Sequence, residues 1–337
     1  MTLASAVLSG DRLSLARLLT QVENDSAEGR AALAELFPHT GRAHLIGVTG
    51  ATGTGKSSLV NQLALHYRRQ EDKRVAVVAV DPSSPFTGGA VLGDRVRMRD
   101  LAGDPNVFIR SMATRGSLGG LARATADMVQ VFDAAGFDMI LIETVGAGQS
   151  EVEIARLAHT TLVVEAPGLG DDIQAIKAGI LEIADILVIN KADRPGVEST
   201  ERALKSTLEL AHPTQRVFRH HRQALNVESE TLRSDQGDTT IWIPPILRTI
   251  STEGKGFVEL AESIGRHVAH LRLSGDWAAR DRARLEVELE ALLQERLVSR
   301  FRESIPPQKY QEVIGRMVKR DLSPNEAARF LMNGGSA

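Results

Sequence analysis

The chain has 337 residues, an apolar fraction of 42%, and 40 basic residues against 43 acidic ones. This length accommodates one large domain or two smaller ones, and the near-neutral charge gives no electrostatic reason to expect nucleic acid or a membrane as the main partner. Cysteine is absent and no apolar run is long enough for a membrane span, so we expect a soluble, cytoplasmic protein without disulfides or thiolate metal sites.

The first forty residues are predicted to be helical. Leu15, Leu18 and Leu19 belong to an apolar stripe at helical spacing, and Gly10-Asp11 supplies a helix start signal before it. Asp11 and Arg12 come soon after a weak apolar stretch, which disfavours a signal peptide.

A regular alternation of short apolar runs and amphipathic segments occupies residues 44–272. The apolar runs, which are rich in Val and Ile, cover residues 44–49, 74–80, 107–111, 139–143, 161–165, 186–190 and 241–247. Runs of this kind indicate strands buried on both faces with crossover helices between them. The sequence therefore predicts an α/β fold with a doubly wound, mostly parallel sheet. Pro244 and Pro245 weaken the prediction of the last strand, because proline cannot donate to a sheet ladder.

A phosphate-binding loop follows the first predicted strand. Residues 50–57 match the pattern G-x-x-x-x-G-K-[ST] at every fixed position, with a helix predicted after them. The glycines let backbone N–H groups point at phosphates, Lys56 would reach the β- and γ-phosphates, and the Ser57 hydroxyl would bind Mg²⁺. The residues expected at the nucleotide phosphates are Gly50, Ala51, Thr52, Gly53, Thr54, Gly55, Lys56, Ser57 and Ser58. The strand and helix on either side argue against a chance glycine-rich turn.

Three carboxylates are candidates for the same Mg²⁺ ion. Asp81 ends the second predicted strand, Asp94 follows a glycine-rich segment, and Glu143 ends the fourth predicted strand. Carboxylates at these places can hold Mg²⁺ directly or through water, although Asp81 alone would equally suit the cap of a turn. Arg97 would neutralise transition-state charge, or else is an ordinary solvated arginine.

A glycine-containing loop follows Glu143. Gly146 would bring a backbone N–H against the γ-phosphate, so that the loop responds to hydrolysis. Gln149 would orient the attacking water, and a plain surface glutamine is an equally good interpretation.

An N-K-x-D pattern at the end of the sixth predicted strand indicates the base. The Asp193 carboxylate can only accept hydrogen bonds, so it can accept from both the N1–H and the exocyclic N–H₂ of guanine. Adenine offers neither donor in that arrangement. Lys191 would stack along the ring, Asn190 would bridge two loops, and Ser251 would belong to a final loop behind the base.

Residues 274–335 differ from the sheet region in character. Leucines at helical spacing lie in a highly charged stretch, which Pro306-Pro307 interrupts before a further helix. This apolar stripe must be buried either on its own chain or on a partner subunit, and the spacing leaves both open. We predict an N-terminal helical segment (1–40), a P-loop GTPase domain (41–273) and a C-terminal helical arm (274–337).

Three segments carry a specific resemblance. Residues 81–98, 110–120 and 143–151 resemble the MeaB/ArgK-type GTPases, the G-protein chaperones of adenosylcobalamin-dependent acyl-CoA mutases such as methylmalonyl-CoA mutase. The resemblance implies a P-loop GTPase of the SIMIBI type with GTP or GDP and Mg²⁺ as ligands. It implies Mg²⁺-site roles for Asp81, Asp94 and Glu143.

The same resemblance implies a partner and an assembly. Residues 167–177 match a third switch, with Lys177 at the position linked to coupling with the mutase. Family members are homodimers held partly by their C-terminal helices, which favours a dimerisation arm here. They gate loading of adenosylcobalamin, which this chain would meet only through its client mutase, and they help to clear damaged cofactor.

Two other functions use a similar nucleotide fold. A nickel-insertion GTPase chaperone would usually carry Cys/His metal motifs, and this chain offers only the adjacent pair His220-His221, which favours an exposed loop. A small-molecule kinase would use the same phosphate loop, but N-K-x-D and two glycine-rich switches argue against it. The prediction from sequence is therefore a GTP-hydrolysing chaperone of a cobalamin-dependent acyl-CoA mutase.

Overall fold

The computed structural model describes residues 2–82, 98–101, 103–114, 120–144, 155–168, 183–211 and 241–333. The chain divides into two compact units, Met1–Arg284 and Leu285–Ala337. Each unit is considered separately below.

The chain begins with three short helices. They are α1 (Leu3–Leu8), α2 (Arg12–Glu23) and α3 (Ala27–Leu36), followed by the 3-10 turn η1 (Phe37–His39). Thr2, Asp11 and Ser26 precede α1, α2 and α3, and each side chain accepts a hydrogen bond from a backbone N–H of the first turn. The start signal at Gly10-Asp11 therefore acts as predicted.

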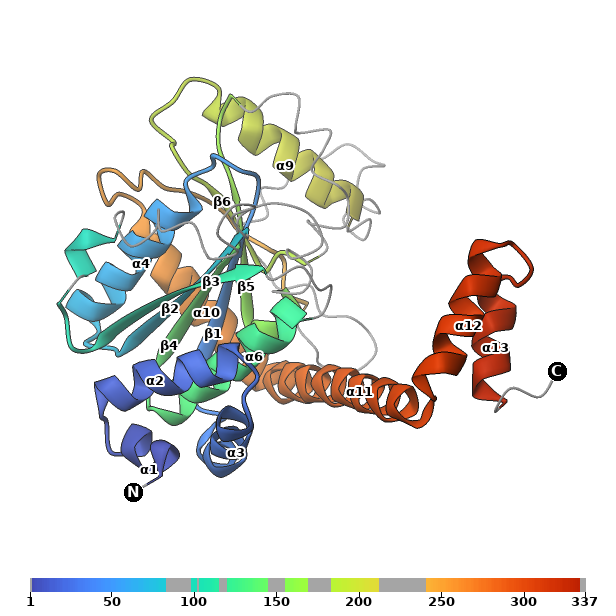
Figure 1. Cartoon of the computed structure of the whole chain (residues 1–337). Coiled ribbons are helices and arrows are strands. Elements are labelled where there is room, and N and C mark those ends of the chain that lie inside the picture. The colour runs from blue at the N-terminus through green and yellow to red at the C-terminus, as the bar shows by residue number, and fades with distance from the viewer. Residues whose placement is uncertain are drawn as a thin grey trace. The chain divides into compact units, whose positions relative to one another are not determined.

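A seven-stranded sheet forms the centre of the first unit within the described residues, and all its strand pairs are parallel (Figure 1). Its strands are β1 (His44–Thr49), β2 (Val75–Pro82), β3 (Val107–Thr114), β4 (Met139–Thr144), β5 (Thr160–Glu165), β6 (Ile186–Ile189) and β7 (Ile246–Arg248). The strand order is β3-β2-β4-β1-β5-β6-β7, so the chain winds outward in both directions from β1. The predicted doubly wound α/β fold is confirmed.

The last strand is shorter than predicted and lies later in the chain. The prediction placed it at residues 241–247, whereas β7 covers only Ile246–Arg248. Pro244 and Pro245 lack the backbone N–H that a ladder needs, so regular pairing begins only after them. Pro245 still contributes its carbonyl oxygen, which accepts a hydrogen bond of 2.9 Å from the Leu187 N–H.

Helices cover both faces of the sheet. They are α4 (Lys56–Gln70), α6 (Gly120–Ala134), α9 (Val197–Ala211) and α10 (Phe257–Ser274), with the short turn η2 (Arg99–Leu101). In β2, Ala76, Val78 and Val80 join the core shared with α1, α2, α3 and α6, whereas Val75 and Val77 join the core shared with α4 and α10. Strand side chains alternate between the faces, so both faces of β2 are apolar.

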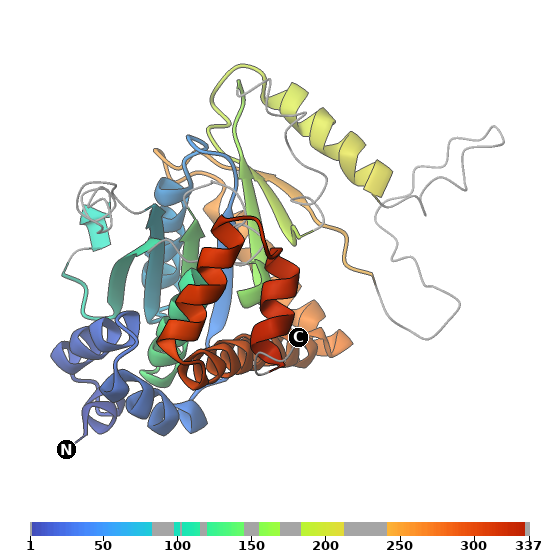
Figure 2. The same ribbon diagram turned by 45° about the vertical axis from the view of Figure 1, so that its right-hand side comes forward.

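A third, smaller core lies near the edge of the sheet formed by β6 and β7. It is formed by Leu187 and Ile189 of β6 with Val197, Leu204 and Leu208 of α9. Figure 2 shows α9 in yellow beside this edge. The edge strands are therefore packed on a helix, as doubly wound sheets require.

The second unit is helical. The long helix α11 (Asp276–Ser304) begins in the first unit, and α12 (Pro307–Val318) and α13 (Pro324–Met332) follow it. Ser323 and Glu326 form a capping box that starts α13. The cationic groups of Lys309 and Arg316 both contact the Phe330 ring, at 5.5 and 5.6 Å from its centroid.

Candidate nucleotide site

The loop between β1 and α4 has the backbone that a phosphate-binding loop requires. Gly50 and Gly55 adopt φ angles of 136° and 93°, in the region that favours glycine. A Cβ at Gly50 would overlap the Val164 carbonyl oxygen of β5, and a Cβ at Gly55 would lie 2.5 Å from Asn190 Nδ2. Both glycines are therefore required by their neighbours as well as by their φ angles.

Lys56 is the first residue of α4, and its side chain is buried. The Nζ atom donates to the carbonyl oxygens of Gly50 (2.8 Å) and Ala51 (3.0 Å). The ammonium group therefore lies over the loop that precedes it in the chain. A cation held there, at a helix N-terminus, provides the electrostatic environment that a polyphosphate needs.

Ser57 and Glu143 bring two oxygen donors together from different elements. The Ser57 hydroxyl, in the first turn of α4, donates to Glu143 Oε1 at 2.5 Å. Glu143 is buried in β4, which lies between β1 and β2. A hydroxyl and a carboxylate are ligands that Mg²⁺ accepts, so this pair suits the predicted ion.

The backbone of Asp81 extends to the same edge of the sheet. Asp81 lies next to Pro82 at the end of β2, and Val80 is paired with Thr144 of β4, the residue after Glu143. The carboxyl ends of these two neighbouring strands therefore carry the two predicted carboxylates. The side chain of Asp81 lies outside the described residues.

Asn190 follows β6 and connects the phosphate loop to a second loop. Its Nδ2 donates to the Thr54 carbonyl oxygen at 2.9 Å, and its Oδ1 accepts from the Ser251 hydroxyl at 2.8 Å. Thr249 Oγ1 and the Ser251 N–H also lie 3.2 and 3.3 Å from Oδ1. The amide therefore joins the ends of β1, β6 and β7, as the sequence predicted for a bridging asparagine.

Lys191 and Asp193 lie beside this junction. Lys191 has a positive φ of 56° and its Nζ donates to the Gly53 carbonyl oxygen at 2.5 Å. The Ala192 N–H donates to the Thr249 carbonyl oxygen at 3.1 Å, which fixes the turn to the loop after β7. Asp193 is exposed at that turn. All three side chains of the N-K-x-D pattern are thus at the carboxyl edge of the sheet.

Other predicted site residues lie outside the described part of the chain. They are Asp94, Arg97, Gly146, Gln149 and Lys177, together with the pair His220-His221. Their roles remain predictions.

One contact below the phosphate loop was missed from the sequence. The Thr144 hydroxyl of β4 donates to the Thr49 hydroxyl of β1 at 3.2 Å, and both residues are completely buried. Each is an ordinary threonine at a strand end. The contact could have been predicted only by knowing that β1 and β4 are neighbouring strands, and the spacing of motifs does not reveal strand order.

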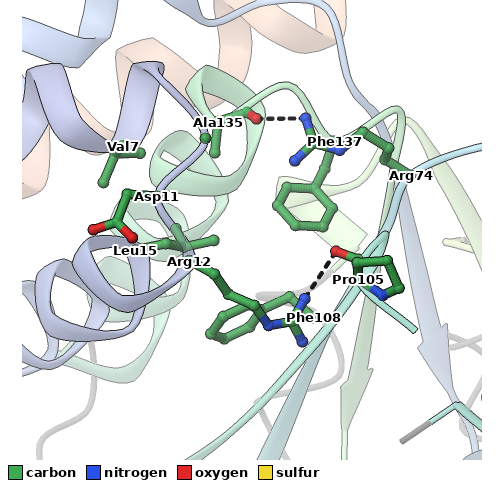
Figure 3. Close-up of a pocket in the computed structure, with 10 residues that line it drawn as sticks. Val7, Asp11, Arg12, Leu15, Arg74, Pro105, Phe108, Ala135 and Phe137 are labelled. Atoms are coloured by element: carbon green, nitrogen blue, oxygen red, sulfur yellow. Dashed lines mark hydrogen bonds between the residues drawn. The ribbon is translucent and has the colours of Figure 1, made fainter. Parts of the chain in front are cut away.

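The pocket drawn in Figure 3 lies apart from this site and serves packing. Arg12 of α2 donates to the carbonyl oxygens of Pro105 (2.9 Å) and Val107 (2.7 Å), and its guanidinium lies 5.0 Å from the Phe108 ring centroid. Arg74 likewise donates to the Ala135 carbonyl oxygen at 2.9 Å. Arg12 and Arg74 both use these hydrogen bonds to bind backbone carbonyl oxygens, so the pocket is part of the packing between α2 and the sheet.

Two further findings concern only the described ranges. There, no group of three or more His, Asp or Glu side chains is arranged to hold a metal ion. In the same ranges, none of the helices combines the length and apolar character needed to cross a membrane.

Comparison with known proteins agrees with this site. Residues 15–305 match the family model described as methylmalonyl Co-A mutase-associated GTPase MeaB. The chain belongs to the MeaB family. A putative GTPase of Pyrococcus abyssi is 43% identical over 323 residues, covering 96% of this chain and 93% of the relative.

Two further relatives are informative. The mouse protein named methylmalonic aciduria type A homolog, mitochondrial, is 31% identical over 353 residues, covering 98% of this chain and 78% of its own length. GTPase ArgK of Escherichia coli is 43% identical over 188 residues, covering 55% of this chain and 56% of the relative.

A solved structure has the same fold. The crystal structure of a LAO/AO transport system kinase superimposes with a TM-score of 0.66 and 25% identity, covering 98% of this MeaB-family chain and 95% of the other. With the phosphate loop and the family match, this makes the protein a P-loop GTPase.

Proposed function

We propose that this protein is a homodimeric, cytoplasmic GTPase chaperone for a cobalamin-dependent acyl-CoA mutase, either methylmalonyl-CoA mutase or a relative. In this role it gates loading of adenosylcobalamin onto the mutase and protects or reactivates the loaded enzyme. The family description names association with methylmalonyl-CoA mutase, and the mouse relative is named for methylmalonic aciduria. These names support the choice of client.

The observation that carries the nucleotide assignment is the Asn190 junction. Asn190 contacts the phosphate loop through Thr54 and the loop after β7 through Ser251. The turn that carries Asp193 is thereby fixed beside the phosphate loop. In the proposal the Asp193 carboxylate accepts the N1–H and the exocyclic N–H₂ of guanine, and Lys191 lies along the base. An adenine in that position would leave buried polar groups unpaired.

Lys56 and the loop N–H groups hold the phosphates in this proposal. Ser57, Glu143, Asp81 and Asp94 hold Mg²⁺, directly or through water. When bound there, Mg²⁺ would supply neutralisation of the negative charge on the phosphates. In this proposal Lys56 leaves the Gly50 and Ala51 carbonyl oxygens to bind the phosphates, and its present contacts with the phosphate loop support that role.

Hydrolysis is an in-line attack of water on the γ-phosphorus, with cleavage of the bond to the β–γ bridging oxygen. We assign the γ-phosphate contact to the Gly146 N–H, the orientation of water to Gln149 and charge compensation to Arg97. Lys177 is assigned to coupling with the mutase. Intrinsic turnover is slow in this proposal, because none of these groups is a strong general base.

The dimer is proposed to form partly through the C-terminal arm. Large apolar side chains at four-residue intervals on α11 are exposed in the single chain: Leu285, Leu289, Leu293, Leu297 and Phe301. Residues four apart are neighbours on a helix surface, so these side chains form an apolar band that winds slowly around α11 and that a second copy would bury. The segments 1–40, 41–273 and 274–337 remain our proposed division by function.

The experiment that tests the client is GTP hydrolysis by the full-length protein, alone and with purified acyl-CoA mutases, with ATP as the control nucleotide. We expect one mutase to accelerate GTP hydrolysis at least about tenfold, a threshold set well below the roughly 10³–10⁵-fold that an arginine finger supplied by a partner gives. GTP binding without acceleration by any cobalamin-dependent mutase would contradict the chaperone assignment while leaving the GTPase assignment intact.

A further inference from the structure

A buried network of ionisable groups lies at the amino-terminal ends of β1, β5 and β6, where the first turns of α11 meet the sheet. We call residues 276–284 the α11 root, and they belong to the first unit. Asp185, just before β6, accepts hydrogen bonds of 2.8 Å from both Nη atoms of Arg280 in the root. It also accepts from the Thr161 N–H at 2.8 Å. The root is thus attached to the sheet by a two-point charged contact.

His159 makes a second attachment and is held neutral by its geometry. Its Nδ1 accepts from the Leu45 N–H at 3.1 Å, so that nitrogen cannot carry a proton while the bond exists. Its Nε2 lies 3.0 Å from Asp281 Oδ1, and its ring is stacked on Trp277 at 3.9 Å between centroids. Both partners are in the α11 root. Protonating Nδ1 would break the contact to β1.

His44 is the third member, and it is linked to α10 through a hydroxyl. His44 Nε2 lies 2.8 Å from Thr160 Oγ1, which lies 2.9 Å from His267 Nδ1. His267 Nε2 is 3.2 Å from Asp185 Oδ1. A hydroxyl has one hydrogen, so it can donate to only one imidazole and must accept from the other. His44 has a hydroxyl but no carboxylate in direct contact.

Charged and titratable groups from several elements lie near these imidazoles. The groups that face them are Asp185 before β6, His267, His270 and Arg272 of α10, and Arg280, Asp281 and Arg284 of the root. Burial lowers the pKa of His44 well below its usual value, and the neighbouring His159 and His267 lower it further. Burial also lowers the pKa of His159, against the opposing effect of Asp281.

We propose that His44, His159 and Asp185 form a pH-sensitive clasp that holds the α11 root to the sheet while both imidazoles are neutral and opens when they are protonated. In the closed clasp His159 Nδ1 accepts a hydrogen bond from the Leu45 N–H, and the Asp185 carboxylate binds the Arg280 guanidinium. A proton on His44 or His159 places an additional cation among Arg272, Arg280 and Arg284. The proton on His159 also removes the acceptor of the Leu45 N–H.

The pH dependence of the clasp has the direction that proton linkage requires. A histidine whose pKa is depressed in the closed state favours closing above the pKa of the open state, which is near 6.5. Closing is progressively lost as pH falls from that value toward the closed-state pKa. The clasp is therefore shut at neutral pH and loosens in mildly acidic solution.

Tryptophan fluorescence can report on whether the clasp is open or closed. Its two tryptophans both belong to the cluster: Trp277 stacks on His159, and Trp242 lies 4.7 Å from His267 between ring centroids and donates to the Asp185 carbonyl oxygen. Trp242→Phe leaves Trp277 in the root as the sole tryptophan. Acrylamide quenching of full-length W242F then measures how accessible the root is.

The test compares three proteins in the W242F background between about pH 7.5 and 5.5, the range in which histidines titrate. H44Q/H159N replaces the titrating nitrogens, because the Gln amide can replace His44 Nε2 toward Thr160 and the Asn oxygen can replace His159 Nδ1 toward Leu45. H39N removes an exposed histidine outside the cluster and is the matched control. GTP binding verifies that each variant is folded.

We expect the quenching constant of W242F and of its H39N derivative to rise at least about twofold on acidification, and that of H44Q/H159N to stay flat. Hydrogen exchange of residues 276–284, corrected for the intrinsic pH effect, should lose up to about tenfold protection per pH unit per histidine in W242F. A pH-independent root in W242F would overturn the proposal. The same dependence in a folded H44Q/H159N protein would also overturn it.

Discussion

The Nδ2 atom of Asn190 donates to the Thr54 carbonyl oxygen at 2.9 Å, across 136 positions of sequence. Through this bond the end of β6 holds the loop that follows β1. The opposite side of the same amide accepts from the Ser251 hydroxyl. One buried side chain therefore sets the distance between the phosphate loop and the turn that carries Asp193.

Asn190→Ala should weaken GTP binding and lower the melting temperature. The change leaves the Thr54 carbonyl oxygen and the Ser251 hydroxyl without their partner, at a cost of about 1–3 kcal/mol, or roughly five- to 150-fold if it falls on affinity. Isothermal titration with GTP measures the loss. Ser251→Ala removes only one of these bonds and should cost about 1 kcal/mol. Wild-type affinity in the Asn190 variant would show that the junction does not position the site.

Gly55→Ala should be far more damaging than Gly53→Ala, although both glycines have positive φ angles of 93° and 85°. A Cβ at Gly55 would lie 2.5 Å from Asn190 Nδ2, whereas nothing lies within 4 Å of a Cβ at Gly53. Backbone strain of roughly 1 kcal/mol is common to both, and the steric clash adds to it only at Gly55. Thermal unfolding and GTP affinity measure the difference.

The same pair offers a double-mutant test of the contact. In the Asn190→Ala background the amide that the new methyl group meets is gone, so Gly55→Ala should then cost about as much as Gly53→Ala. Strict additivity of Gly55→Ala and Asn190→Ala would argue that the two residues are not in contact.

Ser57→Ala should raise the Mg²⁺ concentration needed for GTP hydrolysis by about tenfold or more, because it removes one oxygen ligand from the proposed ion site. Ser57→Thr keeps the hydroxyl and should restore most of the activity. Titration of the hydrolysis rate with Mg²⁺ provides the comparison. An unchanged Mg²⁺ requirement in Ser57→Ala would remove this side chain from the ion site.

Asp185 should make the stability of the first unit depend on pH in strongly acidic solution. Burial alone would raise its pKa, but the hydrogen bonds from Arg280 and His267 outweigh burial and bring the pKa down to about 2, from 3.8. A depressed folded pKa means that the stabilisation is present above about pH 4 and disappears as pH falls toward 2. The expected contribution is about 2 kcal/mol.

Denaturant unfolding of the wild type and Asp185→Asn at several pH values tests this contribution. The difference in unfolding free energy between the two proteins should shrink as pH falls from about 4 to 2, because the wild-type carboxylate becomes neutral there. A difference that stays constant over that range would mean that the Arg280 contact does not depress this pKa.

The parallel sheet could be predicted from the sequence because runs such as 44–49 and 186–190 are apolar on both faces and close with recognisable motifs. The phosphate loop and N-K-x-D are short, local patterns, so their positions at strand ends followed directly. The start of β7 was misplaced, because residues 241–243 are apolar but Pro244 and Pro245 prevent pairing until Ile246. The prediction followed the apolar run and gave too little weight to the two prolines.

The contacts that hold these motifs together could not be predicted from spacing. Thr49 meets Thr144 only because β1 and β4 are neighbours, and strand order is a tertiary property. The histidines near Asp185 are even less visible: His44, His159 and His267 are far apart in the chain and match no motif. Their association depends on three strand ends and two helices meeting at one edge of the sheet.

The central claim is that the carboxyl edge of the sheet reads guanine through Asp193, and the affinities of wild type and Asp193→Asn for GTP, ATP and xanthosine triphosphate test it most directly. Xanthine carries a carbonyl oxygen where guanine carries its exocyclic N–H₂, so the Asn amide can donate to xanthine and the Asp carboxylate cannot. We predict that the wild type prefers GTP to both other nucleotides by at least about a hundredfold and that the variant prefers xanthosine triphosphate. Equal affinity of the wild type for GTP and ATP, or an unaltered preference for GTP in a folded Asp193→Asn protein, would contradict the account.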